Sequence, residues 1–222
     1  MNKLFLILIL LLFFSCNDST KNKKKAEIFL AQENYDKALD EINKAIQLNK
    51  DNASFYVIRA IIYDYLEEYE SEVSDLTTII SLEKNIDNNR FNAYSQRAYV
   101  LTQLGHYEKA LTDIDFYIDN NVSGNSLSDA YINKASILCK LNDFINAKNY
   151  YQLSIDENTQ RNKELYLQAY IGLANLETDP NTALKILENK LLENDSSSIL
   201  LFTKSSINYD LGKINEAYKG LI

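Results

Sequence analysis

Glycine, proline, histidine and tryptophan are scarce in this sequence. Its 222 residues include 5 Gly, 1 Pro, 1 His and no Trp. All-β folds rely on turns rich in Gly and Pro, so this scarcity favours helices. One His and two Cys supply too few ligands for a metal centre, and no nucleophile–base pair can be assembled around His106, which follows Gly105 in a turn pattern. We therefore expect no cofactor, no metal site and no enzymatic activity.

Positive charge is also limited. Lys and Arg number 23 against 31 Asp and Glu, which gives a net charge of −8. Affinity for nucleic acids comes mainly from neutralising phosphates, so an acidic chain is a poor candidate and we expect no nucleic-acid partner. With 46% hydrophobic and 24% charged residues, the composition is globular, neither disordered nor that of a multi-span membrane protein.

The N-terminus has the pattern of a secretory signal. A basic start, Met1–Lys3, precedes an apolar run over 4–14 that is shorter than the roughly 20 residues of a membrane-spanning helix. The segment Leu12–Cys16 resembles a bacterial lipoprotein box. This resemblance implies a signal peptide over 1–15, a lipid on Cys16, a basic tether over 16–25, and a place in the bacterial cell envelope at the outer membrane. The tether lysines could meet anionic headgroups or remain solvated.

One motif recurs along the rest of the chain. Six segments align so that their fourth residues stand at 38, 72, 110, 147, 183 and 217, with spacings of 34 to 38 residues. Upstream of each segment, bulky, small and bulky residues share one helical face, as do Tyr56, Ala60 and Tyr63. The pattern resembles the tetratricopeptide repeat, a helix–turn–helix unit of 34 residues. It implies an all-α fold over 26–222, a right-handed solenoid of about six repeats: 20–52, 53–86, 91–124, 128–160, 163–196 and an incomplete 198–222.

Several local features follow from the repeat register. The turn inside a repeat needs a residue that tolerates positive φ, which Gly105, Gly212 and Asn142 supply. Asp179 and Pro180 read as an N-cap and a first helical residue.

Other positions depart from the pattern or vary within it. The first helix of repeat one is expected to be short because its sequence is rich in Lys, and repeat five reaches the small position only with a one-residue shift, at Gly172. Three cations, Arg59, Arg97 and Lys134, precede the small residue and are expected to extend along the helix pair. Cys139 lies in an apolar helical pattern and is expected in the core.

The resemblance also implies a partner and a binding surface. In the family, the first helix of each repeat lines a concave groove that binds another protein or a peptide. A carboxylate clamp is not expected, since Val57 and Ser95 stand where cations or amides would be needed. Ile58 and Ile132 also fall in groove register. The partner-binding residues that we predict are Val57, Ile61, Tyr65, Gln96, Tyr99, Gln103, Asn133 and Lys140.

Two alternative functions stay open from the sequence. The chain could be a glycan-binding surface lipoprotein of a nutrient-uptake system, although it has no Trp for aromatic platforms. It could also be a self-assembling spacer, because the last helix, over 214–222, has no polar cap.

The loop over 119–129 imitates part of a calcium site. Oxygen-bearing side chains alternate from Asp119, and Gly124 takes the sixth place, but Ala130 replaces the bidentate Glu at the twelfth. We interpret it as a hydrophilic loop between repeats, with weak calcium binding as the alternative.

Overall fold

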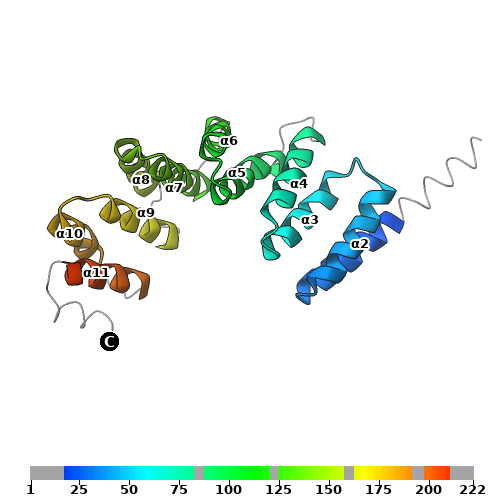
Figure 1. The fold of residues 1–222 in the computed structure, drawn as a ribbon, viewed down its shortest axis with the longest axis horizontal. Helices are drawn as coiled ribbons and strands as arrows, with labels where there is room; N and C mark the ends of the chain where they lie inside the picture. The colour runs from blue at the N-terminus through cyan, green and yellow to red at the C-terminus, as the bar shows by residue number, and fades with distance from the viewer. Residues whose placement is uncertain (1–17, 83–87, 121–124, 158–162, 192–197, 211–222) are drawn as a thin grey trace, which may run out of the picture. The chain divides into compact units, whose positions relative to one another are not determined.

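The computed structural model describes residues 18–82, 88–120, 125–157, 163–191 and 198–210. These residues form helices joined by short turns, with no strand among them (Figure 1). The chain divides into two compact units, Met1–Asp113 and Ile114–Ile222, which we call unit 1 and unit 2. The all-α helical-repeat fold predicted from the sequence is confirmed.

In the described part of the chain, repeats one to five each contribute two helices, and repeat six contributes one. Unit 1 holds a helix over 18–31, α2 (Tyr35–Leu48), α3 (Ala53–Tyr65), α4 (Tyr69–Leu82), α5 (Asn88–Gln103) and the start of α6 (Tyr107–Asp119). Unit 2 holds the rest of α6, α7 (Asn125–Lys140), α8 (Phe144–Glu157), α9 (Lys163–Asn175), α10 (Pro180–Leu191) and α11 (Ser198–Asp210).

The small residues of the repeat lie where helices pack closely. Ala60, Ala98 and Ala135 are at most 1% exposed. Around Ala60, larger apolar side chains such as Ile62 and Leu76 belong to the same core cluster. Burial of such side chains is worth about 1.5–3 kcal/mol each, so the repeat register fixes the helix pairs through their cores.

The structure confirms positive φ at two of the predicted turn residues and shows it at two residues that were not predicted. Gly105 (φ 76°) and Asn142 (φ 61°) have the positive φ that the register requires, while Gly212 lies outside the described residues. Repeats one and two place Glu33 (φ 57°) and Glu67 (φ 56°) at the same position. A residue with a Cβ is strained there, so these two turns are held by the surrounding helices and not by their own preference.

The prediction of a short first helix in repeat one is wrong. That helix covers residues 18–31 and includes most of the segment assigned to a tether. Two of its lysines form ion pairs: Lys23 lies 3.6 Å from Glu27, and Lys25 lies 3.3 Å from Glu41 in α2. Ala26 is fully buried in the core of unit 1, so the helix is held by packing.

Repeat five keeps a close helix contact. A Cβ on Gly172 of α9 would overlap the ring of Tyr151 in α8, so only glycine fits at this place. The N-terminus of α10 also agrees with the sequence, because Asp179 accepts hydrogen bonds from the backbone N–H groups of Asn181 (3.2 Å) and Thr182 (3.0 Å).

Parts of the sequence predictions lie outside the described residues. These are the signal peptide and Cys16, the centre of the 119–129 loop, and the last helix over 214–222. None of the helices in the described ranges has the length and hydropathy of a membrane span.

Candidate protein-binding face

Six of the predicted partner-binding residues lie in unit 1, on α3 and α5, and we call them the groove face: Val57, Ile61, Tyr65, Gln96, Tyr99 and Gln103. Val57, Ile61 and Gln96 are half-buried, and Gln103 is exposed. Two large rings stand out, because Tyr65 is 60% exposed and Tyr99 is 49% exposed. Aromatic rings over half-buried aliphatic side chains are typical of protein-binding surfaces.

The other two predicted residues lie on α7 in unit 2, where Asn133 is half-buried and Lys140 is exposed. Two positions in groove register do not belong to any surface. Ile58 and Ile132 are each only 7% exposed and pack in the cores of their units. The prediction fails there because the family register says which side of a helix a residue lies on, but not how closely the next helix approaches.

A neighbouring ring holds Tyr65 in place. The rings of Tyr35 at the start of α2 and Tyr65 at the end of α3 stack, with centroids 5.1 Å apart and planes inclined by 14°. Burial raises the pKa of the Tyr35 hydroxyl, and the nearby Glu33 carboxylate adds to the rise. Tyr65 therefore presents its ring in a restricted orientation although much of it is exposed.

Acidic and aromatic groups gather beside the groove face around Tyr69, the first residue of α4. Burial raises the pKa of its hydroxyl, with further contributions from Glu67, Tyr99, Asp64 and Glu72. These groups come from α3, the following turn, α4 and α5. We call these five residues the Tyr69 cluster.

Glu72 is the most unusual member of the cluster. It is fully buried, at the repeat position where Ala38 and Ala110 stand in the repeats on either side. Gln96 donates from Nε2 to Glu72 Oε1 at 2.7 Å, while Glu72 Oε2 has no hydrogen-bond partner. Burial raises the pKa of the carboxyl to about 7, since it outweighs the hydrogen bond from Gln96. Sequence reasoning missed this group, although a Glu in a column of Ala was a visible signal.

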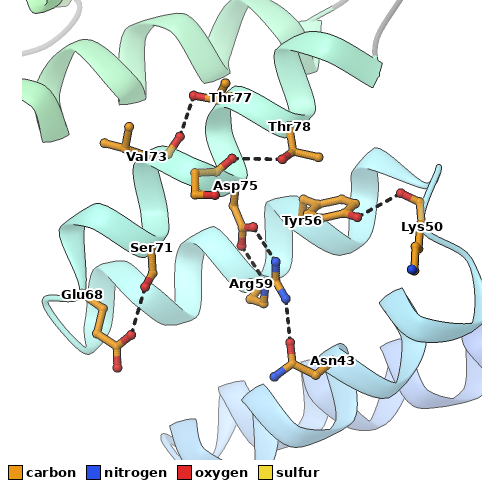
Figure 2. Close-up of polar contacts among 11 residues, drawn as sticks. Asn43, Lys50, Tyr56, Arg59, Glu68, Ser71, Val73, Asp75, Thr77 and Thr78 are labelled. Carbon is orange, nitrogen blue, oxygen red and sulfur yellow. Dashed lines mark hydrogen bonds and ion pairs between the residues drawn. The ribbon is translucent and has the colours of Figure 1, made fainter.

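A cation on the first helix of repeat two links that helix to its neighbours. Arg59 in α3 donates to Asp75 in α4 through Nε (2.8 Å) and Nη2 (2.6 Å), and to Asn43 Oδ1 in α2 through Nη1 (2.7 Å). Figure 2 shows the guanidinium between these two partners. Asp75 is 2% exposed, so one buried carboxylate and one cation join three helices.

The cation at the same repeat position also binds specific partners in repeats three and four. Arg97 pairs with Asp113, 16 residues later, and reaches back to Thr77 at 3.0 Å. In unit 2, Lys134 donates to the hydroxyl of Tyr150 and lies 2.6 Å from Asp115. The sequence predicted that these cations extend along the helix pair; it did not predict the specific partners that they bind there.

Two residues considered for chemistry have ordinary roles. His106 is exposed in the turn after Gly105. Cys139 is half-buried against the core around Tyr151, and burial raises the pKa of its thiol, which disfavours a reactive thiolate. No group of three His, Cys, Asp or Glu side chains in the described ranges could hold a metal ion.

The ends of the 119–129 loop are described, although residues 121–124 are not. Asn120 donates to the backbone carbonyl of Phe116 (2.7 Å), and burial raises the pKa of the Asp129 carboxyl. The Asn120 side chain is therefore bonded to the end of α6, and Asp129 lies half-buried on α7.

Comparison with known proteins agrees with this description. A model of the tetratricopeptide repeat matches residues 24–52 and 128–160. The fold is that of a tetratricopeptide-repeat protein. A TPR repeat-containing protein of Methanocaldococcus jannaschii is 28% identical over 203 residues, covering 81% of this chain and 34% of that protein. Small glutamine-rich tetratricopeptide repeat-containing protein 2 of Saccharomyces cerevisiae is 28% identical over 120 residues, covering 51% of this chain and 33% of that protein. The chain thus spans about a third of the length of these curated relatives.

Solved structures share the fold at low identity. A tetratricopeptide repeat protein from Parabacteroides merdae superposes with a TM-score of 0.76 at 17% identity, covering 92% of this chain and 77% of that one. PilW, a type IV pilus biogenesis factor, gives a TM-score of 0.72 at 17% identity, covering 91% and 90%. YrrB, described as a TPR protein with an unusual peptide-binding site, gives 0.54 at 18% identity, covering 81% and 88%. At these identities the likeness shows the repeat fold alone.

Proposed function

We propose that this protein is a non-catalytic scaffold that binds another protein or a peptide through the groove face of unit 1, while a lipid on Cys16 anchors it to a membrane of the bacterial cell envelope. The observation that carries the proposal is the pair of exposed rings, Tyr65 and Tyr99, on neighbouring first helices of the repeats. The fold likeness to YrrB, a protein with a peptide-binding site, supports the same kind of partner.

The groove face suits a partner for physical reasons. Tyrosine rings supply large contact area at low entropic cost, and they are enriched among the residues that dominate binding energy. Stacking on Tyr35 restricts Tyr65 before binding, so less order has to be imposed when a partner arrives. The neighbouring amides of Gln96 and Gln103 can hydrogen bond with a backbone.

The anchor rests on the sequence of residues 1–16. Two or more acyl chains hold a protein stably on a bilayer, where one chain does so only marginally. We place the anchor at the outer membrane on the strength of the lipoprotein-like segment.

Metabolic labelling with palmitate tests the anchor. The wild-type chain should incorporate label and sediment with membranes, and Cys16→Ala should do neither. A Cys16→Ala chain that remains membrane-bound, or a wild-type chain without label, would overturn the lipid anchor and leave the groove face to be tested separately.

A cross-linked pull-down from native membranes tests the groove face. One stoichiometric partner should be recovered, and it should be lost when Tyr65 and Tyr99 are both changed to Ala. In the matched control, Ile145 and Leu153, two exposed apolar residues of α8, are both changed to Ala. This variant should still recover the partner. Equal loss in both variants, or recovery of the chain alone, would contradict binding through the groove face.

A further inference from the structure

The Tyr69 cluster concentrates negative charge without a matching cation. Asp64, Glu67 and Glu72 all lie close enough to influence the Tyr69 hydroxyl. Among the residues that the structure describes, no Lys or Arg forms an ion pair with any of the three. The other buried carboxylates of unit 1 behave differently, since Glu41, Asp75 and Asp113 each have a cation.

Glu72 independently indicates that the cluster has an unused binding group. Its side chain is fully buried, and Oε2 has no partner. A buried polar oxygen without a partner is costly, and most such atoms in proteins are satisfied. The repeat does not need this carboxylate, because Ala fills the same position in the four other repeats where the structure describes it: Ala38, Ala110, Ala147 and Ala183.

The surroundings favour an organic cation over a metal ion. No three acidic, His or Cys side chains in the described ranges are placed to hold a metal. A guanidinium or ammonium group can instead bind separate carboxylates through several N–H donors and can lie against tyrosine rings. Tyr69, whose hydroxyl these carboxylates influence, supplies such a ring, and Tyr99 acts on the same hydroxyl.

We propose that the Tyr69 cluster is a cation-binding subsite that receives an Arg or Lys side chain of the bound protein segment, with Glu72 as the buried counter-charge. This inference rests on the proposed function and specifies the chemistry of the partner. Gln96, which holds Glu72 Oε1 in the free protein, is a long and only half-buried side chain. It can turn aside or share the carboxylate when the cation enters.

Binding of a cation should then depend on pH. The groups that face Glu72 are Asp64 of α3, Tyr69 of its own helix and Gln96 of α5, and none of these is positively charged. The pKa of Glu72 is about 7 in the free protein, and a bound cation favours the ionised form. Affinity should therefore rise about tenfold between pH 6 and pH 8.

The test uses the full chain and a matched pair of peptides. One acetylated peptide has a central arginine between alanines, and its control has citrulline, which is neutral and of the same shape. Chemical shifts of the labelled protein should change around residues 64–72 and 96–99 with the arginine peptide only. A lysine peptide should give the same pattern if charge is sufficient, and a weaker one if the planar guanidinium matters.

Glu72→Gln provides the decisive variant, with Glu70→Gln as its control on the same helix. Glu72→Gln should weaken arginine-peptide binding at least fivefold and abolish its pH dependence, whereas Glu70→Gln should change neither. Glu72→Ala reproduces the residue of the other repeats, so loss of folding is not expected. Equal binding of the citrulline peptide, or unchanged binding by Glu72→Gln, would overturn the subsite.

The subsite and the scaffold can fail separately. If a partner is captured through Tyr65 and Tyr99 and Glu72→Gln does not change its binding, the subsite is refuted and the scaffold is retained. Selective binding of the arginine peptide without any captured partner would retain the subsite and count against the scaffold.

Discussion

Repeat two (α3–α4) and repeat four (α7–α8) share their buried apolar positions but differ in the polar groups that link their helices. Both place a buried Ala on the first helix and a cation just before it: Arg59 precedes Ala60, and Lys134 precedes Ala135. In repeat two the cation grips a buried carboxylate, whereas in repeat four it reaches a tyrosine hydroxyl and an Asp that is 42% exposed. Shared apolar positions therefore set the helix pair, and the polar partners are free to vary.

The second helices differ in a way that concerns function. Repeat four has Ala147 where repeat two has Glu72, and both are fully buried. The Glu72 side chain fills space as Ala147 does, but its buried carboxyl adds a desolvation cost that a methyl group does not have. The difference indicates that repeat two carries a specialised group within an ordinary fold.

The largest expected effect comes from breaking the cation pair of repeat two. Asp75→Ala leaves Arg59 only 21% exposed and without its carboxylate, which should cost about 3 kcal/mol of local stability. Hydrogen exchange of the α3 and α4 amides measures this loss without assuming two-state unfolding of a repeat array. Removing the carboxylate partner of the repeat-four cation Lys134, by Asp115→Ala in α6 of repeat three, should cost less than about 1 kcal/mol because Asp115 is partly exposed. Equal costs would contradict the comparison.

Converting Glu72 to the Ala of repeat four should stabilise the fold. The pKa of Glu72 is about 7 in the folded protein against 4.5 for an unperturbed Glu, so the folded state retains a proton that the unfolded chain releases. Stability should therefore fall as pH rises from about 4.5 through 7. Glu72→Ala should gain about 2–3 kcal/mol at pH 8 and little at pH 4.5, as measured by urea unfolding. A gain that does not change with pH would show that desolvation of the charge is not its cause.

In repeat five, Gly172 of the first helix packs against the ring of Tyr151 in repeat four. Gly172→Ala should destabilise unit 2 by about 2 kcal/mol, because the new methyl group overlaps the Tyr151 ring. Thermal unfolding of the variant checks the size of the effect. Adding Tyr151→Leu should recover part of the loss, and strictly additive losses would argue against this contact.

The smallest effect is expected at the turns. Glu67 in repeat two and Asn142 in repeat four share a positive φ, which Asn tolerates better than Glu. Glu67→Asn should stabilise by about 0.5 kcal/mol, and Asn142→Glu should destabilise by a similar amount. Denaturant midpoints of the two variants should move in opposite directions, and a shift of the same sign in both would refute the argument.

Sequence reasoning predicted what depends on local pattern. The helix pairs, the small residues, the turns at Gly105 and Asn142 and the cap at Asp179 follow from spacing and backbone preference, and the structure agrees. The length of the first helix of repeat one was predicted wrongly from its lysine-rich sequence, because the ion pair of Lys25 with Glu41 on the next helix is not visible in the local pattern.

Contacts that depend on how helices pack were harder to predict. The 16-residue separation of Arg59 and Asp75 has meaning only once α3 lies against α4. The burial of Ile58 and the isolation of Glu72 Oε2 likewise depend on neighbouring helices. Exposure of Tyr65 and Tyr99 agrees with the predicted groove face, but whether a partner binds there stays a prediction.

Site-specific photo-cross-linking in native membranes tests the groove face most directly. A photoreactive phenylalanine analogue is placed at position 65 or 99 of the full chain, and, as control, at Ile145, which is 79% exposed in unit 2. We predict one discrete protein adduct from positions 65 and 99 and none from 145. The same adducts from all three positions, or no adduct from 65 and 99, would contradict the account.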